Sequence, residues 1–524
     1  MLRIALVLIV AGSGPGFAQV MAPVEARPVA PLAPISGSLG AAAAFAPGAT
    51  TLAPSISAAP PSGLALAALP SAAVPTDGAP QRIPPAESGL PAARRPLKST
   101  PERRTNDDEP RPAFDEQFLD DLQHRTFLYF WEQTDPVTGL TKDRAGNFAD
   151  DNHRLASISA TGFGLTALAI ADERGWIPRD QLYARALTTL RQLHDRQAQV
   201  HGWYHHFVDA ATGEPEPSSE VSSIDTALLL AGALSVGRHF QGTEVDHLAQ
   251  EIYERVDFPW MMTDGGAKPD ERTLSMGWTP RGFLKPRWDA YSEHLILYIL
   301  GLGSPTHPLP AAAWRAWRRP EKVITEASGP LFTHQYSQLW LDLKNWRDDG
   351  RDYFAQSVQA TTAHRDAAVA AQGKHSTYGP HSWGWTASDG PEGYKAYGAY
   401  PGHPEHDGTI APAAAGGSAA FTPELSIPAL RWMKEQYGDK IWGRYGFADA
   451  FNADPRWKER FNADGIWRSP DAVGIDQGAI LLAVENARSG GVWKNFMDSE
   501  NVRRAFLRAG LSKAPAGIPP TSSH

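Results

Sequence analysis

Two acidic residues lie where a carboxyl group could transfer a proton. Glu220 follows an aromatic run and directly precedes a predicted apolar helix, and Asp407 precedes Gly408 in a long loop. Acid hydrolysis of an acetal needs one carboxylic acid that protonates the leaving oxygen and one carboxylate that activates water or attacks. Each residue also has an ordinary interpretation, because Glu220 could favour the helix dipole and Asp407 could shape an Asx turn.

Three further acidic residues are also candidates for a role in the site or in the fold. Asp143, beside Arg144, could bond hydroxyl groups or act as a base, although an exposed Asp–Arg pair in a turn is the ordinary alternative. Glu293 falls inside a predicted helix, and we expect it to face a cleft because burial without a partner would be costly. Asp225 lies three residues after Ser222, which is a capping-box spacing, and we expect it to have a structural role.

A long aromatic loop accompanies the acids. Residues 378–424 combine Trp and Tyr with several carboxylates, and loops of this length inside a compact domain are usually functional. Aromatic rings stack on the C–H faces of sugars while acids bond the hydroxyls, and loop tryptophans (203, 278, 383 and 385) are expected to offer such faces. The residues predicted to bind substrate are Arg144, Trp203, His206, Trp278, Trp288, Glu293, His334, Tyr336, Trp383, Trp385 and Tyr394.

The histidines do not form a known metal motif. His205-His206 and the segment 403–407 supply ligand types, but neither has the pair of histidines at i and i+4 with a glutamate on a helix that marks a zinc hydrolase. Residues 135–143 lack the acid ladder of a calcium loop, and no phosphate-binding loop or G-x-S-x-G elbow occurs. We therefore expect neither a metal nor another cofactor.

The composition restricts the class of protein. The chain has 524 residues, 42% of them hydrophobic, with 17 Trp, so it can bury a large core. A net charge of -9 without a basic run argues against nucleic acid as a partner. The absence of Cys excludes disulfides, thiolate metal sites and thiol nucleophiles. The expected partner is a polysaccharide or oligosaccharide, and we expect a monomer.

The N-terminal residues differ from the rest of the chain. Residues 1–18 combine an early Arg3, a short apolar run and a small-residue end, which predicts a secretory signal peptide and a periplasmic or secreted protein. That apolar run is too short to span a bilayer, so no membrane span is expected after cleavage. Residues 19–112 are rich in Ala and Pro and predict a disordered tether, and 512–524 a disordered tail.

The remainder, 113–511, predicts an all-α domain with two kinds of helix. Helices with one apolar face are predicted to lie outside, and helices that are apolar nearly all round are predicted to be buried. Pairing each outer helix with the inner helix after it gives six pairs, the pattern of a six-hairpin (α/α)6 toroid. The outer members are 118–131, 178–196, 243–256, 311–318, 352–371 and 454–461; the inner members are 157–174, 222–239, 288–300, 331–343, 422–437 and 475–486, and 501–509 closes the domain.

The alternation of outer and inner helices predicts the position of the cleft. Successive inner helices run parallel, so the connections that lead into them lie on one rim. The long connections with aromatic and acidic residues are of this kind: 134–155, 201–221, 277–288 and 378–421. We therefore expect the substrate to bind at that rim.

Several motifs together resemble a known domain. From about Phe114 to Leu511, and in order, they resemble the glucoamylase-like domain, and within it the bacterial endo-β-1,2-glucanases of glycoside hydrolase family 144. The motifs are HGWYHHF (201–207), EVSSIDTALLLAGAL (220–234), WDAYSEHLILYILGLGSPTHP (288–308), FTHQYSQLWLDL (332–343), WGWTASDGPEGY (383–394), DGTIAPAAAGGSAAFTPE (407–424), YGFADAFN (445–452) and GIDQGAILLAVENARSG (474–490).

The resemblance implies a secreted or periplasmic hydrolase of β-glucan, endo-acting on β-1,2-linked chains, with inversion of the anomeric centre. It implies that Glu220, in E-x-S-S-I-D, is the acid and that Asp407, in D-G-T, is a candidate for the second carboxylate. Asp143 and Glu293 remain alternatives for that second role. The other functions to consider are a β-1,2-glucan transglycosylase, a hydrolase of another glucan, and a catalytically silent polysaccharide-binding protein.

Overall fold

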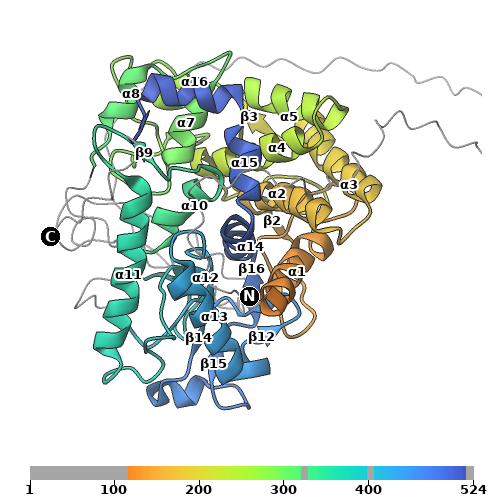
Figure 1. The fold of residues 1–524 in the computed structure, drawn as a ribbon. Coiled ribbons are helices and arrows are strands. Elements are labelled where there is room, and N and C mark those ends of the chain that lie inside the picture. The colour runs from red at the N-terminus through yellow and green to blue at the C-terminus, as the bar shows by residue number, and fades with distance from the viewer. Residues whose placement is uncertain (1–115, 320–328, 398–405, 515–524) are drawn as a thin grey trace, which may run out of the picture. The chain divides into compact units, whose positions relative to one another are not determined.

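The computed structural model describes residues 116–319, 329–397 and 406–514, all of which belong to one compact unit of the chain. This part is mostly helical, as predicted, with short strands in the connections (Figure 1). No helix within it is long and apolar enough to cross a membrane. The signal peptide and tether predicted for 1–18 and 19–112 lie outside the described residues, as do 515–524 of the predicted tail.

The helices are named in chain order. They are α1 (Glu116–Glu132), α2 (Ile158–Arg174), α3 (Arg179–Arg191), α4 (Ser223–His239), α5 (Glu244–Glu254), α6 (Phe258–Met262), α7 (Leu295–Gly303), α8 (Ala311–Ala316), α10 (Phe332–Trp340), α11 (Tyr353–Ala371), α12 (Pro412–Gly416), α13 (Pro423–Tyr437), α14 (Gly474–Arg488), α15 (Gly491–Met497) and α16 (Glu500–Ala509).

The strands are two or three residues long. They are β1 (Arg144–Gly146), β2 (Leu155–Ser157), β3 (Gln199–Val200), β4 (Trp203–Tyr204), β5 (Phe207–Asp209), β6 (Val221–Ser222), β7 (Gly277–Thr279), β8 (Gly282–Phe283), β9 (Trp346–Arg347), β10 (Ala387–Ser388), β11 (Lys395–Ala396), β12 (Trp442–Gly443), β13 (Gly446–Phe447), β14 (Phe451–Asn452), β15 (Trp467–Arg468), β16 (Asp471–Val473) and β17 (Ser512–Lys513).

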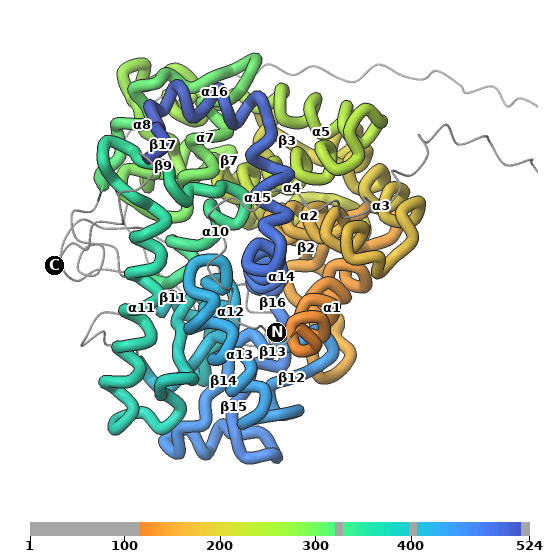
Figure 2. The backbone as a smooth tube through the Cα atoms, viewed as in Figure 1, coloured from red at the N-terminus to blue at the C-terminus, as the bar shows by residue number. Residues whose placement is uncertain are grey.

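The buried helices pack side by side. α2 packs on α4, α4 on α7, and α7 on α10, and both α10 and α12 pack on α14. α14 in turn packs on α2 and on α1, so the last long helix of the chain lies beside the first two (Figures 1 and 2). The first and last parts of the domain are therefore joined by direct packing.

Local sequence explains where α2 and α4 begin and where α2 ends. The Ser157 and Ser222 side chains accept hydrogen bonds from backbone N–H groups in the first turn of α2 and α4, which satisfies donors that have no partner within the helix. Gly175 ends α2 in the left-handed conformation, with φ 67°. Between these ends almost every side chain is buried, as expected for inner helices.

Two glycines set the distance between α2 and α4. A Cβ atom at Gly232 would lie 1.9 Å from the carbonyl oxygen of Gly162, and a Cβ at Gly162 would lie 2.4 Å from the carbonyl oxygen of Leu228. No side chain could occupy these positions without moving a backbone. The two helices therefore approach more closely than side chains larger than hydrogen would allow.

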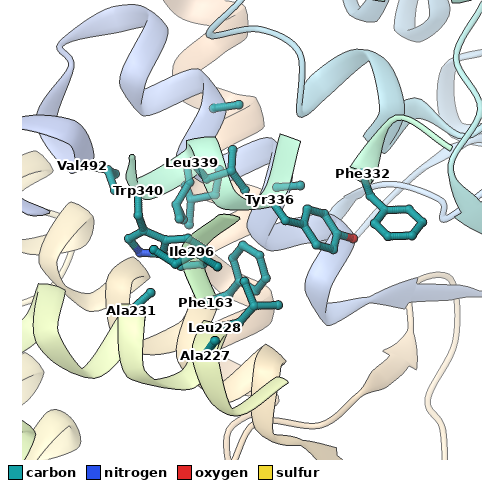
Figure 3. Close-up of a cluster of buried hydrophobic side chains, with 14 of the residues drawn as sticks. Phe163, Ala227, Leu228, Ala231, Ile296, Phe332, Tyr336, Leu339, Trp340 and Val492 are labelled. Carbon is teal, nitrogen blue, oxygen red and sulfur yellow. The ribbon is translucent and has the colours of Figure 1, made fainter. Parts of the chain in front are cut away.

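The centre of the packing is shown in Figure 3. Phe163 from α2, Leu228 and Ala231 from α4, Ile296 from α7 and Trp340 from α10 meet there, and all are buried. The rings of Phe163 and Trp340 are 4.9 Å apart, measured between centroids. Side chains from four consecutive inner helices thus share one core.

The short strands connect the segments that lead into inner helices. β1 pairs with β16, β2 with β5, and β6 with β7, all antiparallel. β1 and β2 precede α2, β5 and β6 precede α4, and β7 precedes α7, while β16 precedes α14. Backbone hydrogen bonds therefore fix the relative positions of the segments predicted to form the cleft.

Two of the predicted helix pairs are wrong. The inner helix of the fifth pair is the five-residue α12, whose side chains are all buried, whereas α13, predicted as inner, is amphipathic and packs on α12. Residues 454–461 are not an outer helix, because they hold a 3-10 turn, Pro455–Arg460, with no buried side chain. α13 takes that outer position, directly before the strands that lead to α14.

Two boundaries also differ from the prediction. The inner helix predicted from residue 288 begins at Leu295, because the backbone before it is held in a parallel bridge between Ala290 and Arg318. The tail predicted to begin at 512 starts later, since Ser512 and Lys513 pair with Arg347 and Trp346.

Candidate active site

Glu220 lies beside His206 on paired backbone segments. The N–H of His206 donates to the carbonyl oxygen of Glu220 at 2.9 Å, and His205 and Val221 form the neighbouring bridge. This register places the two side chains side by side, with Nδ1 of His206 3.1 Å from Oε1 of Glu220. The other carboxylate oxygen, Oε2, is buried and has no hydrogen-bond partner among the described residues. The Glu220 carboxylate is thus held through one oxygen only.

His206 also contacts a second carboxylate. Its Nε2 lies 3.4 Å from Oδ1 of Asp225, and the Ser222 hydroxyl donates to the other Asp225 oxygen at 2.6 Å. Burial alone would lower the pKa of His206, but the charge of Asp225 and the hydrogen bond and charge of Glu220 raise it to about 9. Burial likewise opposes ionisation of Glu220, yet the hydrogen bond and charge of His206 bring the pKa of Glu220 below its ordinary value.

The structural role expected for Asp225 is confirmed. Its backbone N–H donates to the Ser222 hydroxyl at the start of α4. The contact between its carboxylate and His206 was not predicted, because capping-box spacing describes only the helix end. Asp225 therefore has both a capping position and a charged partner in the site.

Glu293 is buried just before α7 rather than inside a helix that faces a cleft. Its side chain is 7% exposed and accepts a hydrogen bond from the Ser292 hydroxyl. Burial, opposed by the Ser292 hydrogen bond and helped by the charge of Asp225, raises the pKa of Glu293 to about 7. Glu293 therefore keeps its proton up to a pH of about 7, well above the range of an ordinary glutamic acid.

Carboxylates from three segments of the chain lie close to Arg144. Its guanidinium lies 3.5 Å from Asp143, 3.3 Å from Asp389 and 3.5 Å from Asp471. Burial would lower the pKa of Arg144, but these charges raise it well above its ordinary value. The predicted pair of Asp143 and Arg144 is thus part of a larger half-buried group that joins the connections before α2, α12 and α14.

Asp449 and Asp476 form a pair that sequence reasoning missed. Each is 2% exposed, and each has one carboxylate oxygen without a partner among the described residues. Asp449 accepts a hydrogen bond of 2.7 Å from the backbone N–H of Asp389, and Tyr336 lies 3.5 Å from Asp476. Burial raises the pKa of both carboxyls, and their mutual proximity keeps a proton on the pair.

A signal for Asp476 was present in the sequence. Asp225 is the third residue of α4, in Ser-Ile-Asp, and Asp476 is the third residue of α14, in Gly-Ile-Asp. Both helices are inner helices entered from the same kind of connection. The repeated placement of an acid in the first turn could have identified Asp476.

The charges of these acids also act on the pKa values of nearby groups. The charge of Asp143 raises the pKa of His206, and the charges of Asp476 and Glu293, after burial, raise that of Tyr336. Tyr394 is half-buried, and its pKa is also raised by burial and then by Asp476. Tyr336 and Tyr394, predicted to bind substrate, therefore lie with the acids.

Asp407 lies in a different part of the site. Its carboxylate accepts hydrogen bonds from the Tyr397 hydroxyl at 3.1 Å and from the backbone N–H of Thr409 at 2.9 Å. The second contact shows the Asx-type arrangement that was the ordinary interpretation. No contact joins Asp407 to Glu220 in the described part of the chain. Gly390, which follows Asp389 of the Arg144 group, packs closely on the Tyr397 hydroxyl that bonds Asp407.

Three of the predicted stacking tryptophans are buried. Trp203 and Trp383 have no exposed surface, and Trp385 is 1% exposed. Trp385 donates from its indole nitrogen to the Tyr378 hydroxyl and to the Thr409 carbonyl, both at 3.2 Å. The expectation that these three rings offer faces to a sugar is therefore wrong, because the loops fold inward and use the rings as core.

The other predicted binding residues differ in accessibility. Trp288 is buried and donates to the Ser223 hydroxyl at 2.9 Å, and His334 is buried with its ring 5.2 Å from Tyr291. Trp278 is half-buried on β7 and packs 6.0 Å from Trp260. Of the five predicted tryptophans, four are buried and Trp278 is half-buried.

Potential metal ligands do not cluster in a suitable way. Within 116–319, 329–397 and 406–514, no group of three or more His, Asp or Glu side chains is placed to hold a metal ion. The acids are instead balanced by Arg144 and His206, or by retained protons.

Comparison with known families agrees with the resemblance seen in the sequence. Residues 285–500 match the Glycoamylase family model, described as "Putative glucoamylase". This part of the chain is similar to a glucoamylase-like domain. The matched region includes Glu293, the Asp449 and Asp476 pair, and Asp407, whereas Glu220 and Arg144 precede it.

The chain also has a curated relative. An exo β-1,2-glucooligosaccharide sophorohydrolase (non-reducing end) from Parabacteroides distasonis is 27% identical over 441 residues. The match covers 76% of this chain and 58% of the relative, so the chain spans less than two thirds of the relative's length.

Two solved structures resemble this chain over most of their length. One from Bacteroides uniformis, described with the same words as the family model, is 28% identical with a TM-score of 0.68, covering 76% of this chain and 98% of that chain. An endo-β-1,2-glucanase from Chitinophaga pinensis, crystallised with sophorotriose and glucose, is 28% identical with a TM-score of 0.66 and the same coverage.

Proposed function

We propose that this protein is a glycoside hydrolase that cleaves β-1,2-linked glucan inside the chain, with inversion of the anomeric centre. The observation that carries the proposal is the state of Glu220: one oxygen is bonded to His206, and the other is buried without a partner in the described site. A general acid needs such a free oxygen to reach the leaving group. The β-1,2-glucan activities of the similar proteins support the substrate.

The remaining residues have proposed roles in the same reaction. Glu220 protonates the leaving oxygen, and Asp407 acts as the second carboxylate, with Asp143 or Glu293 as the replacement if Asp407 only shapes its loop. Arg144 and the tyrosines beside Asp476 bind sugar hydroxyls. A catalytically silent binding protein would have no need of the proton held near Glu293 and Asp476.

We propose endo action because of the extent of similarity to an endo-acting enzyme. The endo-β-1,2-glucanase is covered over 98% of its chain, whereas the exo-acting sophorohydrolase is covered over 58% of its length. We also propose that the six helix pairs close into an (α/α)6 toroid, which the packing of α14 on α2 and α12 supports.

We propose that the protein is exported as a monomer to the periplasm or medium, on the basis of residues 1–18. N-terminal sequencing of the mature protein tests this, and a mature chain that begins at Met1 would contradict it. Light scattering of the mature protein tests the monomer.

A panel of purified polysaccharides with product sizing tests the activity and its mode. Endo action on β-1,2-glucan predicts a range of oligosaccharides early in the reaction, whereas a disaccharide as the only early product would show exo action. Proton NMR of the first anomer formed tests inversion. A retained anomer would instead support transglycosylation.

Two variants test the assigned carboxyls. Glu220→Gln and Asp407→Asn should each lower kcat by orders of magnitude while substrate still binds. A matched control is Glu459→Gln, at a site 86% exposed and outside the group of acids, which should leave kcat unchanged. Full activity of Glu220→Gln on β-1,2-glucan would refute the acid assignment.

A further inference from the structure

His206 has both ring nitrogens directed at carboxylates. Nδ1 lies 3.1 Å from Glu220 and Nε2 3.4 Å from Asp225. Its backbone is fixed on both sides, because its N–H donates to Glu220 and its carbonyl accepts from Ile158 at 3.1 Å. The ring also stacks on Phe207, with centroids 3.8 Å apart. The imidazole is therefore held in one orientation by backbone, ring and charge contacts.

We propose that His206 supplies the proton that Glu220 passes to the leaving oxygen, and that Asp225 holds His206 in the tautomer this transfer requires. This proposal rests on the proposed function, in which Glu220 is the acid. His206 acts through Glu220 and is a positioning residue, since its two nitrogens are occupied by the carboxylates.

The resting state holds one transferable proton. His206 is doubly protonated and donates to both carboxylates, while Glu220 is ionised, which agrees with the directions of their pKa shifts. The proton on Nδ1 moves to Oε1 of Glu220 and makes the carboxyl group neutral. This group then turns so that its protonated oxygen takes the place of Oε2, and it protonates the leaving oxygen as the C1–O bond breaks. Water adds to C1 and gives its proton to the second carboxylate. That carboxylate releases a proton to solvent, and neutral His206, whose Nε2–H faces Asp225, takes one up.

The charged surroundings predict a specific pH dependence. His206 faces Asp225 on α4 and Glu220 before it, and the charge of Asp143 also acts on it. Glu293 lies near Asp225, and Arg144 lies beside Asp143. A histidine whose pKa is raised to about 9 keeps its proton at neutral pH and loses it as the pH rises through that value. The turnover number kcat should therefore fall at alkaline pH, as His206 loses its proton.

Asp225→Asn tests the inference, because it removes one charge that raises the pKa of His206 and keeps the side-chain size. We expect the basic limb of kcat to move down by about one pH unit or more, the range for a neighbouring charge. Direct titration of His206 by NMR should move by the same amount. A thermal melt verifies folding, and if Asp225→Asn does not fold, His206→Gln should flatten the basic limb and lower kcat about 10²-fold or more.

His194 provides a matched control. It also lies between two carboxylates, Asp195 at 2.6 Å in η1 (Gln192–Arg196) and Glu251 at 2.8 Å in α5, but both of these carboxylates are exposed and lie outside the group of acids. His194→Gln should leave the limb and kcat unchanged.

Two results would overturn the proposed proton transfer from His206 to Glu220. In the first, the titration of His206 moves in Asp225→Asn while the basic limb of kcat stays, so His206 only holds Glu220 in place. In the second, neither moves, so Asp225 does not act on His206. If the native protein leaves β-1,2-glucan intact, the proposed function fails, and the NMR titration still decides whether Asp225 controls His206.

Discussion

Replacing Glu293 with Gln should stabilise the protein at alkaline pH and not at acid pH. The pKa of Glu293 is raised from an ordinary value of 4.5 to about 7 by burial. Below pH 4.5 the carboxyl is protonated in both the folded and the unfolded chain, so it contributes no difference. As the pH rises towards 7 only the unfolded chain releases the proton, and the folded state loses stability. Above pH 7 the unfolding free energy is reduced by the full amount.

The size of this effect follows from the same values. A difference of about 2.5 between the folded and unfolded pKa corresponds to about 3 kcal/mol of unfolding free energy. With an unfolding entropy of about 2.1 cal/mol/K per residue over roughly 400 residues, this is a Tm increase of about 4 °C. Gln has nearly the same shape and can still accept the Ser292 hydrogen bond.

Calorimetric melts at pH 4.5 and pH 8, at one scan rate, measure the effect. Glu293→Gln should match the native protein at pH 4.5 and exceed its Tm by about 4 °C at pH 8. The exposed Glu459→Gln should show no such dependence. An equal Tm difference at both pH values would show that Glu293 does not hold its proton in the folded state and would refute the reasoning.

Three further changes test the packing and the second acid pair. Trp385→Ala should lower the unfolding free energy by about 3–5 kcal/mol and lower the Tm, because the ring is part of the core. Trp278→Ala, at a half-buried ring, should lower the unfolding free energy less. If calorimetry shows an unchanged Tm for Trp385→Ala together with weaker sugar binding, the ring is accessible to substrate. Gly232→Ala should lower the unfolding free energy by about 1–3 kcal/mol or more, since the new methyl meets a backbone carbonyl, while Gly373→Ala, with open space around it, should have little effect in urea titrations. Asp449→Asn should raise the Tm more at pH 8 than at pH 4, because burial raises the pKa of this carboxyl, and a Tm that falls at pH 8 would contradict a retained proton.

The inner helices were predictable because their signal is local. The predicted ranges 157–174 and 222–239 agree with α2 and α4 to within one residue at each start, since serine caps and continuous apolar residues mark both. The segment 288–294 was misassigned for the opposite reason. Its apolar residues continue the helical pattern, and the contact with Arg318 that holds it extended is distant in sequence.

The candidate site was predicted in part. Glu220, Asp143 and Arg144 lie among the acids as the connections into inner helices suggested. The burial of Trp385 could not be predicted, because an aromatic loop residue looks the same whether its ring faces sugar or core. The contact between His206 and Asp225 depends on strand register and helix position together, and no local pattern contains both.

The pairing of β1 with β16 has a consequence for the order in which activity arises. Arg144 and Asp471 are separated by 327 positions, yet they lie 3.5 Å apart in the site. During synthesis the early segment must wait for nearly the whole domain before its partner exists, and closing so distant a contact slows folding. A chain interrupted between Glu220 and β16 would carry Glu220 and His206 but would lack the strand that orients Arg144. Activity should therefore appear only with the last helix pair, and partial products of translation should be inert.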